Sequence, residues 1–235
     1  MESFITLKSQ RGINPDTQNL VAEPTKRVRQ IFKNLKKFAE DSNTNIREVV
    51  RLVVFVADMA RDRPIVNKTQ KELWGDDGPF PCRTIVEVDY LGDDFIEIDF
   101  TLRVPAIDSA PLKFLSPEGS FSPTGTWSLG LKSDDCVFVS GMRGINPADN
   151  KLVIGEAPRA RQALENLKLI INSVGFNFSQ AISIVIYVTE ERFLEMVEML
   201  IKKYWENKPL PLMEVHVVTS LNDNDTIEIE TTFSR

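Results

Sequence analysis

The chain has 235 residues, of which 42% are hydrophobic and 26% charged, and its formal net charge is −6. This composition is typical of a soluble globular protein, and the acidic balance disfavours sequence-independent binding of nucleic acid. No apolar run approaches the roughly 18 residues of a membrane span, and the first residues lack a secretion signal, so we expect a cytoplasmic protein with no membrane partner.

The first half of the chain predicts a short strand, a helix, a buried strand, a second helix and two further strands. A strand is expected at 4–7, and apolar residues at helical spacing, such as Ile31 and Leu35, predict a helix over 25–41. The β-branched run at 49–56 predicts a buried strand. Pro64 suits the first turn of a helix, which we place over 64–74. Two more strands are expected at 84–89 and 95–104.

The second half repeats this order after a segment rich in Pro and Ser at 105–123, which predicts a linker. Helices are expected over 158–174 and 192–205, and strands over 183–188, 213–219 and 226–233. The second half also contains a hairpin, with strands at 126–131 and 136–140. The first half has only one strand at the corresponding place, so its opening hairpin is truncated.

An internal repeat connects the two halves. Arg11-Gly12-Ile13-Asn14-Pro15 returns as Arg143-Gly144-Ile145-Asn146-Pro147, a shift of 132 residues. The same shift relates Arg29-Gln30 to Arg161-Gln162, Asn34-Leu35-Lys36 to Asn166-Leu167-Lys168, and Val53 and Val56 to Val185 and Val188. A repeat of this length indicates two copies of one domain, because solenoid units are only about 20–50 residues long. We therefore predict domains at 1–104 and 124–235.

The fold class expected for each copy is α+β. A full copy has the order ββαβαββ, which predicts a mixed sheet with two helices on one face. The other face is also apolar, as in Ile184-Val185-Ile186, and must be covered by another sheet within or between chains. We therefore expect a homo-oligomer, with a trimer favoured. Cys82 and Cys136 lie in apolar contexts and are expected to be reduced core residues.

Several motifs resemble those of the RidA/YjgF family, small trimeric proteins of the chorismate-mutase-like fold. The resemblance covers nearly the whole chain as two copies. The matching motifs are Ser140-Gly141 after a strand, Pro81-Cys82-Arg83 leading into Glu87-Val88, Val66-Asn67 on the second helix, and the closing strand Ile96-Glu97-Ile98, which returns as Ile227-Glu228-Ile229.

The resemblance implies a deaminase that uses no metal or organic cofactor. Such an enzyme would hydrolyse a small carboxylate-bearing imine or enamine, 2-aminoacrylate-like or an aminated ring-cleavage product, to a 2-keto acid and ammonia. By the family pattern, Arg83 would bind the substrate carboxylate and Glu97 would transfer protons with a water. The residue types suit these roles, since a guanidinium matches a carboxylate bidentately and an imine carbon is already electrophilic.

The two copies differ at the positions that matter for this chemistry. Arg83 aligns with Met213, so the second copy lacks the carboxylate anchor, and we therefore favour Glu97 over Glu228. The first copy has Lys8-Ser9 in place of the Ser-Gly pair. A hybrid pocket follows, with catalytic Arg83 and Glu97 and substrate-binding Asn67 from the first copy, and substrate-binding Trp127, Ser140 and Gly141 from the second. The pairing within or between chains stays open.

A second reading is a non-catalytic protein. The family's cysteine two residues after its arginine is Ile85 here, and the second arginine is lost, as expected of a degenerate scaffold or a sensor of small carboxylates. Ribonuclease activity is disfavoured, because the chain is acidic and has no basic-aromatic stripe. The single histidine, His216, lies in an expected strand and is read as structural.

Overall fold

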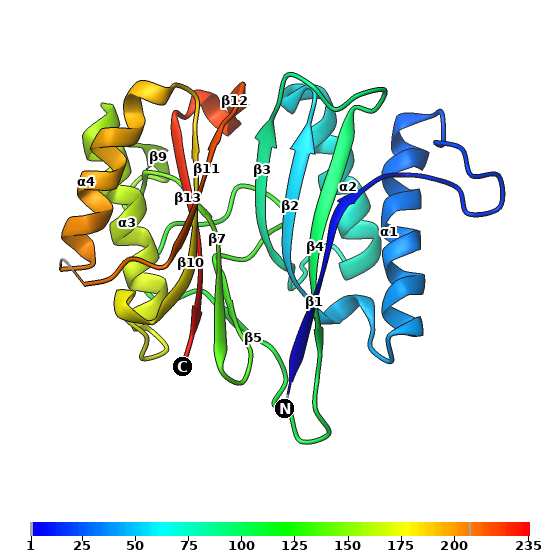
Figure 1. Cartoon of the computed structure of the whole chain (residues 1–235), viewed down its shortest axis with the longest axis horizontal. Coiled ribbons are helices and arrows are strands. Elements are labelled where there is room, and N and C mark those ends of the chain that lie inside the picture. The colour runs from blue at the N-terminus through cyan, green and yellow to red at the C-terminus, as the bar shows by residue number, and fades with distance from the viewer. Residues whose placement is uncertain (1, 207) are drawn as a thin grey trace.

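The computed structural model describes residues 2–206 and 208–235. Figure 1 shows two sheets that face each other at the centre of the molecule, with two helices on the outer side of each. The predicted α+β class is therefore confirmed, and each half of the chain builds one sheet with its helices. None of the helices in the described part of the chain combines the length and apolarity needed to cross a bilayer.

The elements follow the expected order with several additions. The helices are α1 (Pro24–Asp41), α2 (Met59–Trp74), α3 (Glu156–Asn172) and α4 (Leu194–Tyr204), and short 3-10 turns occupy Ile46–Glu48, Phe178–Gln180, Glu191–Phe193 and Asn222–Asn224. The strands are β1 (Ser3–Gln10), β2 (Val49–Val56), β3 (Cys82–Glu87), β4 (Ile96–Val104), β5 (Lys113–Leu115), β6 (Gly130–Lys132), β7 (Cys136–Met142), β8 (Ile145–Asn146), β9 (Lys151–Leu152), β10 (Ala181–Val188), β11 (Leu212–Val217), β12 (Ser220–Leu221) and β13 (Ile227–Ser234).

Both sheets are mixed. The first has the order β1-β4-β2-β3-β12 and the second β11-β10-β13-β7-β6-β5. In the first sheet, β2 runs parallel to β3 and antiparallel to β4. In the second sheet, β10 runs in the same way parallel to β11 and antiparallel to β13. In each copy the second helix connects the two parallel strands. This arrangement is expected when a helix connects two strands of one sheet, because a parallel pair needs a crossover.

The repeated motif has a structural explanation. A Cβ on Gly12 would lie 2.4 Å from Cγ of Arg27, and a Cβ on Gly144 would lie 2.4 Å from Cγ of Arg159, so only glycine fits at either position. The repeated asparagine holds the turn in place, since Nδ2 of Asn34 donates to the carbonyl of Ile13 at 2.8 Å. Its counterpart in the second copy makes the same bond. The repeat therefore preserves the packing of this turn on the first helix of each copy.

Two short strands extend the sheets across the expected domain boundaries. Strand β12, in the second half, pairs antiparallel with β3, with Leu221 opposite Val86, and so extends the first sheet. Residues 105–123, expected to be a linker, contain β5, which pairs with β6 and extends the second sheet. Neither strand carries a local signal strong enough to predict it, because each is two or three residues long and depends on a distant partner.

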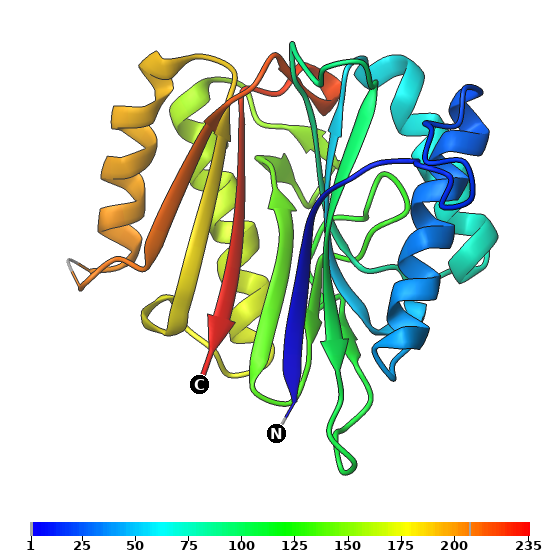
Figure 2. The same ribbon diagram turned by 45° about the vertical axis from the view of Figure 1, so that its right-hand side comes forward.

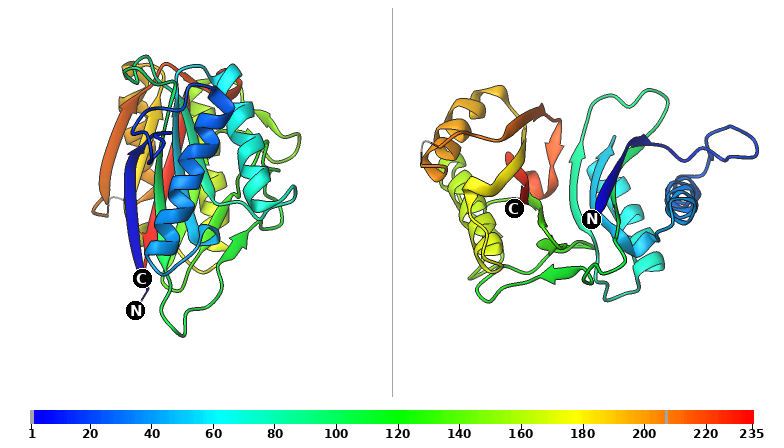
Figure 3. Two further views of the ribbon diagram at one scale, coloured as in Figure 1. Left: turned by 90° about the vertical axis from the view of Figure 1, so that its right-hand side faces the viewer. Right: turned by 60° about the horizontal axis from the view of Figure 1, so that its bottom comes forward.

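The inner faces of the sheets cover each other. Figure 3 shows the two sheets as opposed layers with the helices outside. Valine side chains of β2 and β3, Val53 and Val86, form a cluster with Val185 and Tyr187 of β10 and Leu221 of β12. The apolar second face predicted from the sequence is therefore buried inside one chain.

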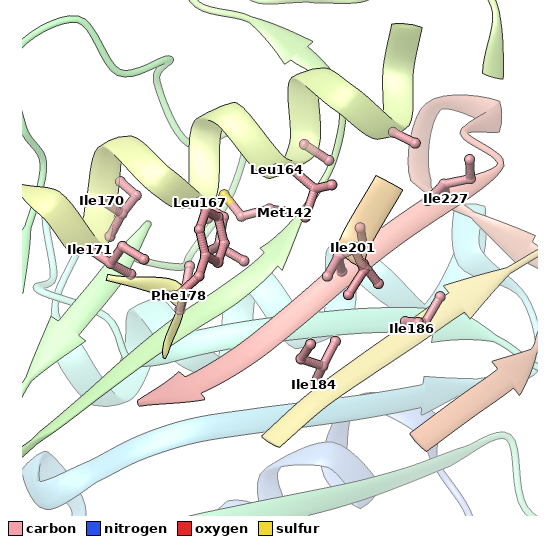
Figure 4. Close-up of a cluster of buried hydrophobic side chains, with 14 of the residues drawn as sticks. Met142, Leu164, Leu167, Ile170, Ile171, Phe178, Ile184, Ile186, Ile201 and Ile227 are labelled. Atoms are coloured by element: carbon pink, nitrogen blue, oxygen red, sulfur yellow. The ribbon is translucent and has the colours of Figure 1, made fainter. Parts of the chain in front are cut away.

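Each sheet also packs on its own helices. Figure 4 shows this core in the second domain, where Leu164 and Leu167 of α3 and Ile201 of α4 lie over Ile184 and Ile186 of β10. Burying such side chains contributes about 1.5–3 kcal/mol each. These cores fix the positions of the strands that carry the candidate site.

Two predicted elements differ most from the structure. Helix α2 begins at Met59 instead of Pro64, because the side chain of Asp58 caps it by accepting from the N–H of Arg61 at 2.9 Å. Pro64 therefore lies inside the helix. The strand predicted at 126–131 is reduced to β6 at Gly130–Lys132, and Trp127 lies in the irregular segment before it.

Candidate active site

Strands β3 and β7 join the two domains at the centre of the molecule (Figure 2). The backbone N–H of Arg83 donates to Oγ of Ser140 at 2.9 Å, and the backbone N–H of Gly141 donates to Oγ1 of Thr84 at 3.1 Å. Oγ1 of Thr84 also donates to Oε2 of Glu230 at 2.5 Å. Residues of the first domain are thus held at fixed positions against β7 and β13.

Arg83 lies at this junction and is only 4% exposed. Its Nη1 donates to neutral oxygens, Oδ1 of Asn67 at 2.8 Å, Oε1 of Gln70 at 2.5 Å and Oγ1 of Thr126 at 2.9 Å. Its Nε is buried without a partner in the described chain. Burial and, after it, the like charge of Arg63 lower the pKa of Arg83 from its usual value. The guanidinium is oriented by neutral groups and keeps donors free for an anion.

A narrow cavity of about 20 Å³ opens beside Arg83. Its wall combines cationic, aromatic and acidic side chains from both domains: Arg63, Arg83, Ile85, Thr124, Trp127, Gly141, Arg143, Asn222 and Glu228. The indole of Trp127 packs on Phe121, with ring centroids 6.0 Å apart, and so forms a fixed apolar wall. This mixture of an apolar surface with a few converging polar groups is typical of a small-molecule site.

Glu228 supplies the acidic group of the cavity. It is buried, and burial raises its pKa to about 8, although the charges of Arg143 and Arg83 oppose the shift. Its carboxyl lies directly over Gly141, where a Cβ would come within 1.8 Å of Oε1. Glycine at 141 therefore makes room for this carboxyl. A carboxylic acid with a pKa near neutrality can both donate and accept a proton under physiological conditions.

The structure brings five of the six predicted site residues to this junction, in two different positions. Arg83, Trp127 and Gly141 line the cavity. Asn67 and Ser140 lie behind it, because Oδ1 of Asn67 accepts from Arg83 and the hydroxyl of Ser140 accepts from the Arg83 backbone and donates to the carbonyl of Ser128 at 2.5 Å. These two residues hold Arg83, which differs from the predicted role of touching the substrate.

The sixth residue, Glu97, is elsewhere, so the structure contradicts its predicted place beside Arg83. Along β2, Arg83 is in register with Leu52 and Glu97 with Phe55. Positions three apart on a strand point to opposite faces of the sheet. Glu97 therefore lies on the other face, where Oε1 is 3.9 Å from Nε of Arg11.

Sequence reasoning missed three charged lining residues as site residues: Glu228, Arg63 and Arg143. A signal for Glu228 exists, because β7 and β13 pair within one sheet, with Ile229 opposite Met142. The copy that contributes Gly141 must therefore also contribute the glutamate of the closing strand. No local pattern marks Arg63, since a charged residue on a helix is usually solvated.

A wider hollow lies on the outer face of α3 and α4, but the charged side chains around it, such as Lys168 and Lys203, are exposed to solvent. We therefore place the candidate site in the cavity between the domains. Across residues 2–206 and 208–235 no group of three or more His, Cys, Asp or Glu side chains has the arrangement of a metal site. The thiol of Cys82 is free and buried, and burial raises its pKa to about 12.

The chain matches known proteins in two consecutive stretches. A model of the family described as Endoribonuclease L-PSP matches residues 2–104 and 118–233. The 2-iminobutanoate/2-iminopropanoate deaminase of Rattus norvegicus is 29% identical over 119 residues, which are 50% of this chain and 86% of the rat protein. A RutC family protein of Pyrococcus horikoshii is 29% identical over 94 residues, 39% of this chain and 75% of that protein.

A solved structure is similar as well. The probable translation initiation inhibitor from Rhodopseudomonas palustris superposes with a TM-score of 0.51 at 30% identity and covers 53% of this chain and 98% of its own. A single-domain protein of this kind therefore corresponds to about half of the present chain. The family model matches both halves of the chain.

Proposed function

We propose that this chain, which belongs to the Endoribonuclease L-PSP family, also called RidA/YjgF, is a deaminase of small carboxylate-bearing imines or enamines. The observation that carries the proposal is the pairing of Arg83, whose charge meets only neutral oxygens, with the buried carboxyl of Glu228 across one cavity. Similar proteins named as 2-iminobutanoate/2-iminopropanoate deaminases support the assignment.

In this proposal Arg83 binds the substrate carboxylate. Asn67, Gln70 and Thr126 fix the plane of its guanidinium by accepting from Nη1, so that the remaining N–H groups face the cavity in a constant orientation. Binding replaces an uncompensated buried charge with an ion pair, which is favourable because an unpaired charge in an apolar site is costly. Trp127 and Ile85 contact the apolar part of the substrate.

Glu228 carries out the proton transfers. In its acid form it donates a proton to the imine nitrogen while a water adds to the imine carbon, so that a C–O bond forms and the C=N electron pair moves to nitrogen. The resulting carboxylate takes the proton lost by the water. Collapse of the carbinolamine breaks the C–N bond and releases ammonia and a 2-keto acid. A pKa near the working pH suits a group that must act in both directions.

The experiment follows 2-keto acid and ammonia release from 2-iminobutanoate generated in solution by an amino-acid oxidase. We expect acceleration by the wild type and loss of it in Arg83→Ala. Arg83→Lys should be nearly as inactive, because an ammonium cannot reproduce the bidentate fork. For binding of 2-oxobutanoate, measured by calorimetry, the loss should be about 10- to 100-fold, since hydrogen bonds to charged groups contribute about 1.5–3 kcal/mol.

Met213→Ala is the matched control, because Met213 occupies the place of Arg83 in the second copy. Its activity should equal that of the wild type, and calorimetry should give a stoichiometry near one ligand per chain. Binding with this stoichiometry but without acceleration of imine hydrolysis would favour the non-catalytic alternative, a carboxylate-binding protein. Equal affinity of wild type and Arg83→Ala would remove the anchor role. The net charge of −6 disfavours RNA as a substrate.

A further inference from the structure

The cavity holds more positive charge than one carboxylate requires. Three guanidinium groups line it, those of Arg63, Arg83 and Arg143, against a single lining carboxyl, that of Glu228. Among the residues that the structure describes, no carboxylate lies within salt-bridge distance of Arg83 or Arg63. Two cations that face one cavity without counter-ions indicate a site for anions.

Arg143 is already neutralised. Its Nη1 and Nη2 each lie 3.0 Å from Oδ2 of Asp223, and Nη1 donates to the carbonyl of Asn222 at 2.6 Å. The field of Asp223 also reaches Arg63, but its Oδ2 is occupied by Arg143 and by the side-chain amide of Asn222. Arg143 therefore needs no further anion, whereas Arg63 and Arg83 do.

Arg63 and Arg83 approach each other at Gly125. A Cβ on Gly125 would stand 3.2 Å from Nη2 of Arg83 and 3.3 Å from Nη2 of Arg63, so the two guanidinium ends converge on the same spot. Nη2 of Arg63 donates to a backbone carbonyl, that of Thr124, at 2.9 Å. Like charges brought together beside a buried cavity repel each other unless an anion lies between or alongside them.

Glu228 does not cancel this excess. Burial raises its pKa to about 8, so at neutral pH the carboxyl is mostly uncharged. The cavity then carries two positive charges, on Arg63 and Arg83, that have no counter-ion among the described residues. A monocarboxylic imine would neutralise one of them and leave the other buried or half-buried, which is costly.

We propose that the substrate is a dianion, a short dicarboxylic imine or enamine that places one carboxylate on Arg83 and the second on Arg63. This inference rests on the proposed function for the imine group and extends it to the second anionic group. The reaction is the same hydrolysis: one water is consumed, the C=N bond becomes C=O, and ammonia leaves, while both carboxylates are unchanged. Arg63 thus determines specificity and takes no part in the proton transfers.

The test compares dicarboxylic with monocarboxylic probes. Calorimetry with 2-oxoglutarate and 2-oxobutanoate, the 2-keto acids that hydrolysis of the two imines would yield, should show at least tenfold tighter binding of the dicarboxylate by the wild type. Arg63→Gln should remove this preference while its affinity for 2-oxobutanoate stays within about twofold of the wild type. Lys68→Gln, which removes an exposed positive charge from the same helix, should keep the full preference.

Turnover gives an independent readout. The imines of glutamate and of 2-aminobutanoate, produced by amino-acid oxidases, should be hydrolysed with a clear preference for the dicarboxylic one, and Arg63→Gln should lose only that preference. Arg63→Lys should retain part of it, since a point charge still attracts a carboxylate.

The possible failures are distinguishable. Equal affinity of the wild type for both probes, or an Arg63→Gln variant that weakens both probes equally, would overturn the second-carboxylate role even if 2-iminobutanoate is hydrolysed. The latter result would mean that both arginines share one carboxylate. A dicarboxylate preference that depends on Arg63, without hydrolysis of either imine, would sustain this inference and refute the deaminase function.

Discussion

At the scale of single residues, the environment of Glu228 differs from that of its repeat counterpart Glu97. Glu228 is buried over Gly141, whereas Glu97 is partly exposed on the face of its own sheet that does not carry Arg83. The same residue type in the same motif therefore has two chemistries, and the difference comes from what the other domain places against it. Only Glu228 lies within the cavity that contains Arg83.

The pH dependence of stability follows from this burial. The pKa of Glu228 in the folded state is about 8, above its unfolded value of about 4.5, so the folded state holds the proton more tightly. Its contribution to stability is fully present below pH 4.5 and is lost as the pH rises toward 8. We expect the free energy of unfolding of Glu228→Gln, measured by urea denaturation, to fall less than that of the wild type between pH 5 and pH 8.

Glu97→Gln is the matched control and should follow the wild-type curve over this range. The same pair of variants separates the catalytic roles: imine hydrolysis should fall by roughly 10²- to 10⁴-fold in Glu228→Gln, the usual contribution of a proton-transfer group. Parallel wild-type and Glu228→Gln stability curves would show that the carboxyl is ionised in the folded protein at neutral pH.

At the scale of elements, strand β3 connects the two domains through Thr84. Its hydroxyl accepts from the N–H of Gly141 and donates to Glu230, and Glu230 in turn pairs with Arg51 of β2. Removing the hydroxyl leaves the buried N–H of Gly141 and Oε2 of Glu230 without this hydrogen bond, and unsatisfied buried polar groups cost about 1–3 kcal/mol each.

We therefore expect Thr84→Val, which preserves the shape of the side chain, to lower the free energy of unfolding by about 2 kcal/mol or more. The loss is measured by chemical denaturation followed by tryptophan fluorescence. Thr101→Val is the control, because the hydroxyl of Thr101 makes only one contact of 3.4 Å, with Thr6, and this change should cost much less. Equal losses in the two variants would contradict the connecting role of Thr84.

The elements also show how far the sequence predicts this structure. Strand β2 and helix α1 are found within one residue of their expected bounds, because a β-branched run and an amphipathic periodicity are local signals. Strands β5 and β12 could not be predicted, since each is stabilised by pairing with a distant segment.

The candidate site shows the same division. The hybrid cavity was predicted because each copy retains a different part of the family's motif residues. In the structure Arg83, Trp127 and Gly141 line the same cavity. The identity of the acid was not predicted, because Glu97 and Glu228 occupy equivalent positions, opposite Phe55 and Tyr187. Only the packing of β3 against β7 brings Arg83 to Glu228. The position of the Arg63 side chain depends on the irregular segment around Thr124 and Gly125, and no sequence pattern predicts the path of that segment.

At the scale of the whole molecule, strands β3 and β7 form the junction between the two domains. Their repeat counterparts, β11 and β1, are outer strands that do not pack against each other within the chain. Strand β3 is buried against β7, but β11, its repeat counterpart, is the outer strand of the second sheet, with Leu212 76% and Val217 51% exposed. Strand β1, the counterpart of β7, is likewise the outer strand of the first sheet. We propose that β11 of one chain packs against β1 of the next, as β3 packs against β7 within the chain.

Light scattering should then show a closed homo-oligomer, with a trimer the expected size. Leu212→Glu should dissociate it, because Leu212 corresponds to Cys82, which is buried against Phe138 of β7, and a charge at an apolar interface is costly to bury. Ile154→Glu, at an exposed isoleucine far from β11 in the sequence, should leave the assembly intact. A wild-type monomer, or equal behaviour of the two variants, would exclude this surface as the interface.

The division of the cavity between two copies also changes how the site can evolve. If both walls came from identical domains, every substitution would appear on both sides of every cleft, and each residue would have to satisfy two roles. Here Arg83 serves one wall and Gly141 the other, while their counterparts Met213 and Ser9 serve neither. Selection can therefore adjust the cationic wall and the acidic wall separately, so that a new substrate preference can arise by changing one copy while the other keeps the proton-transfer chemistry.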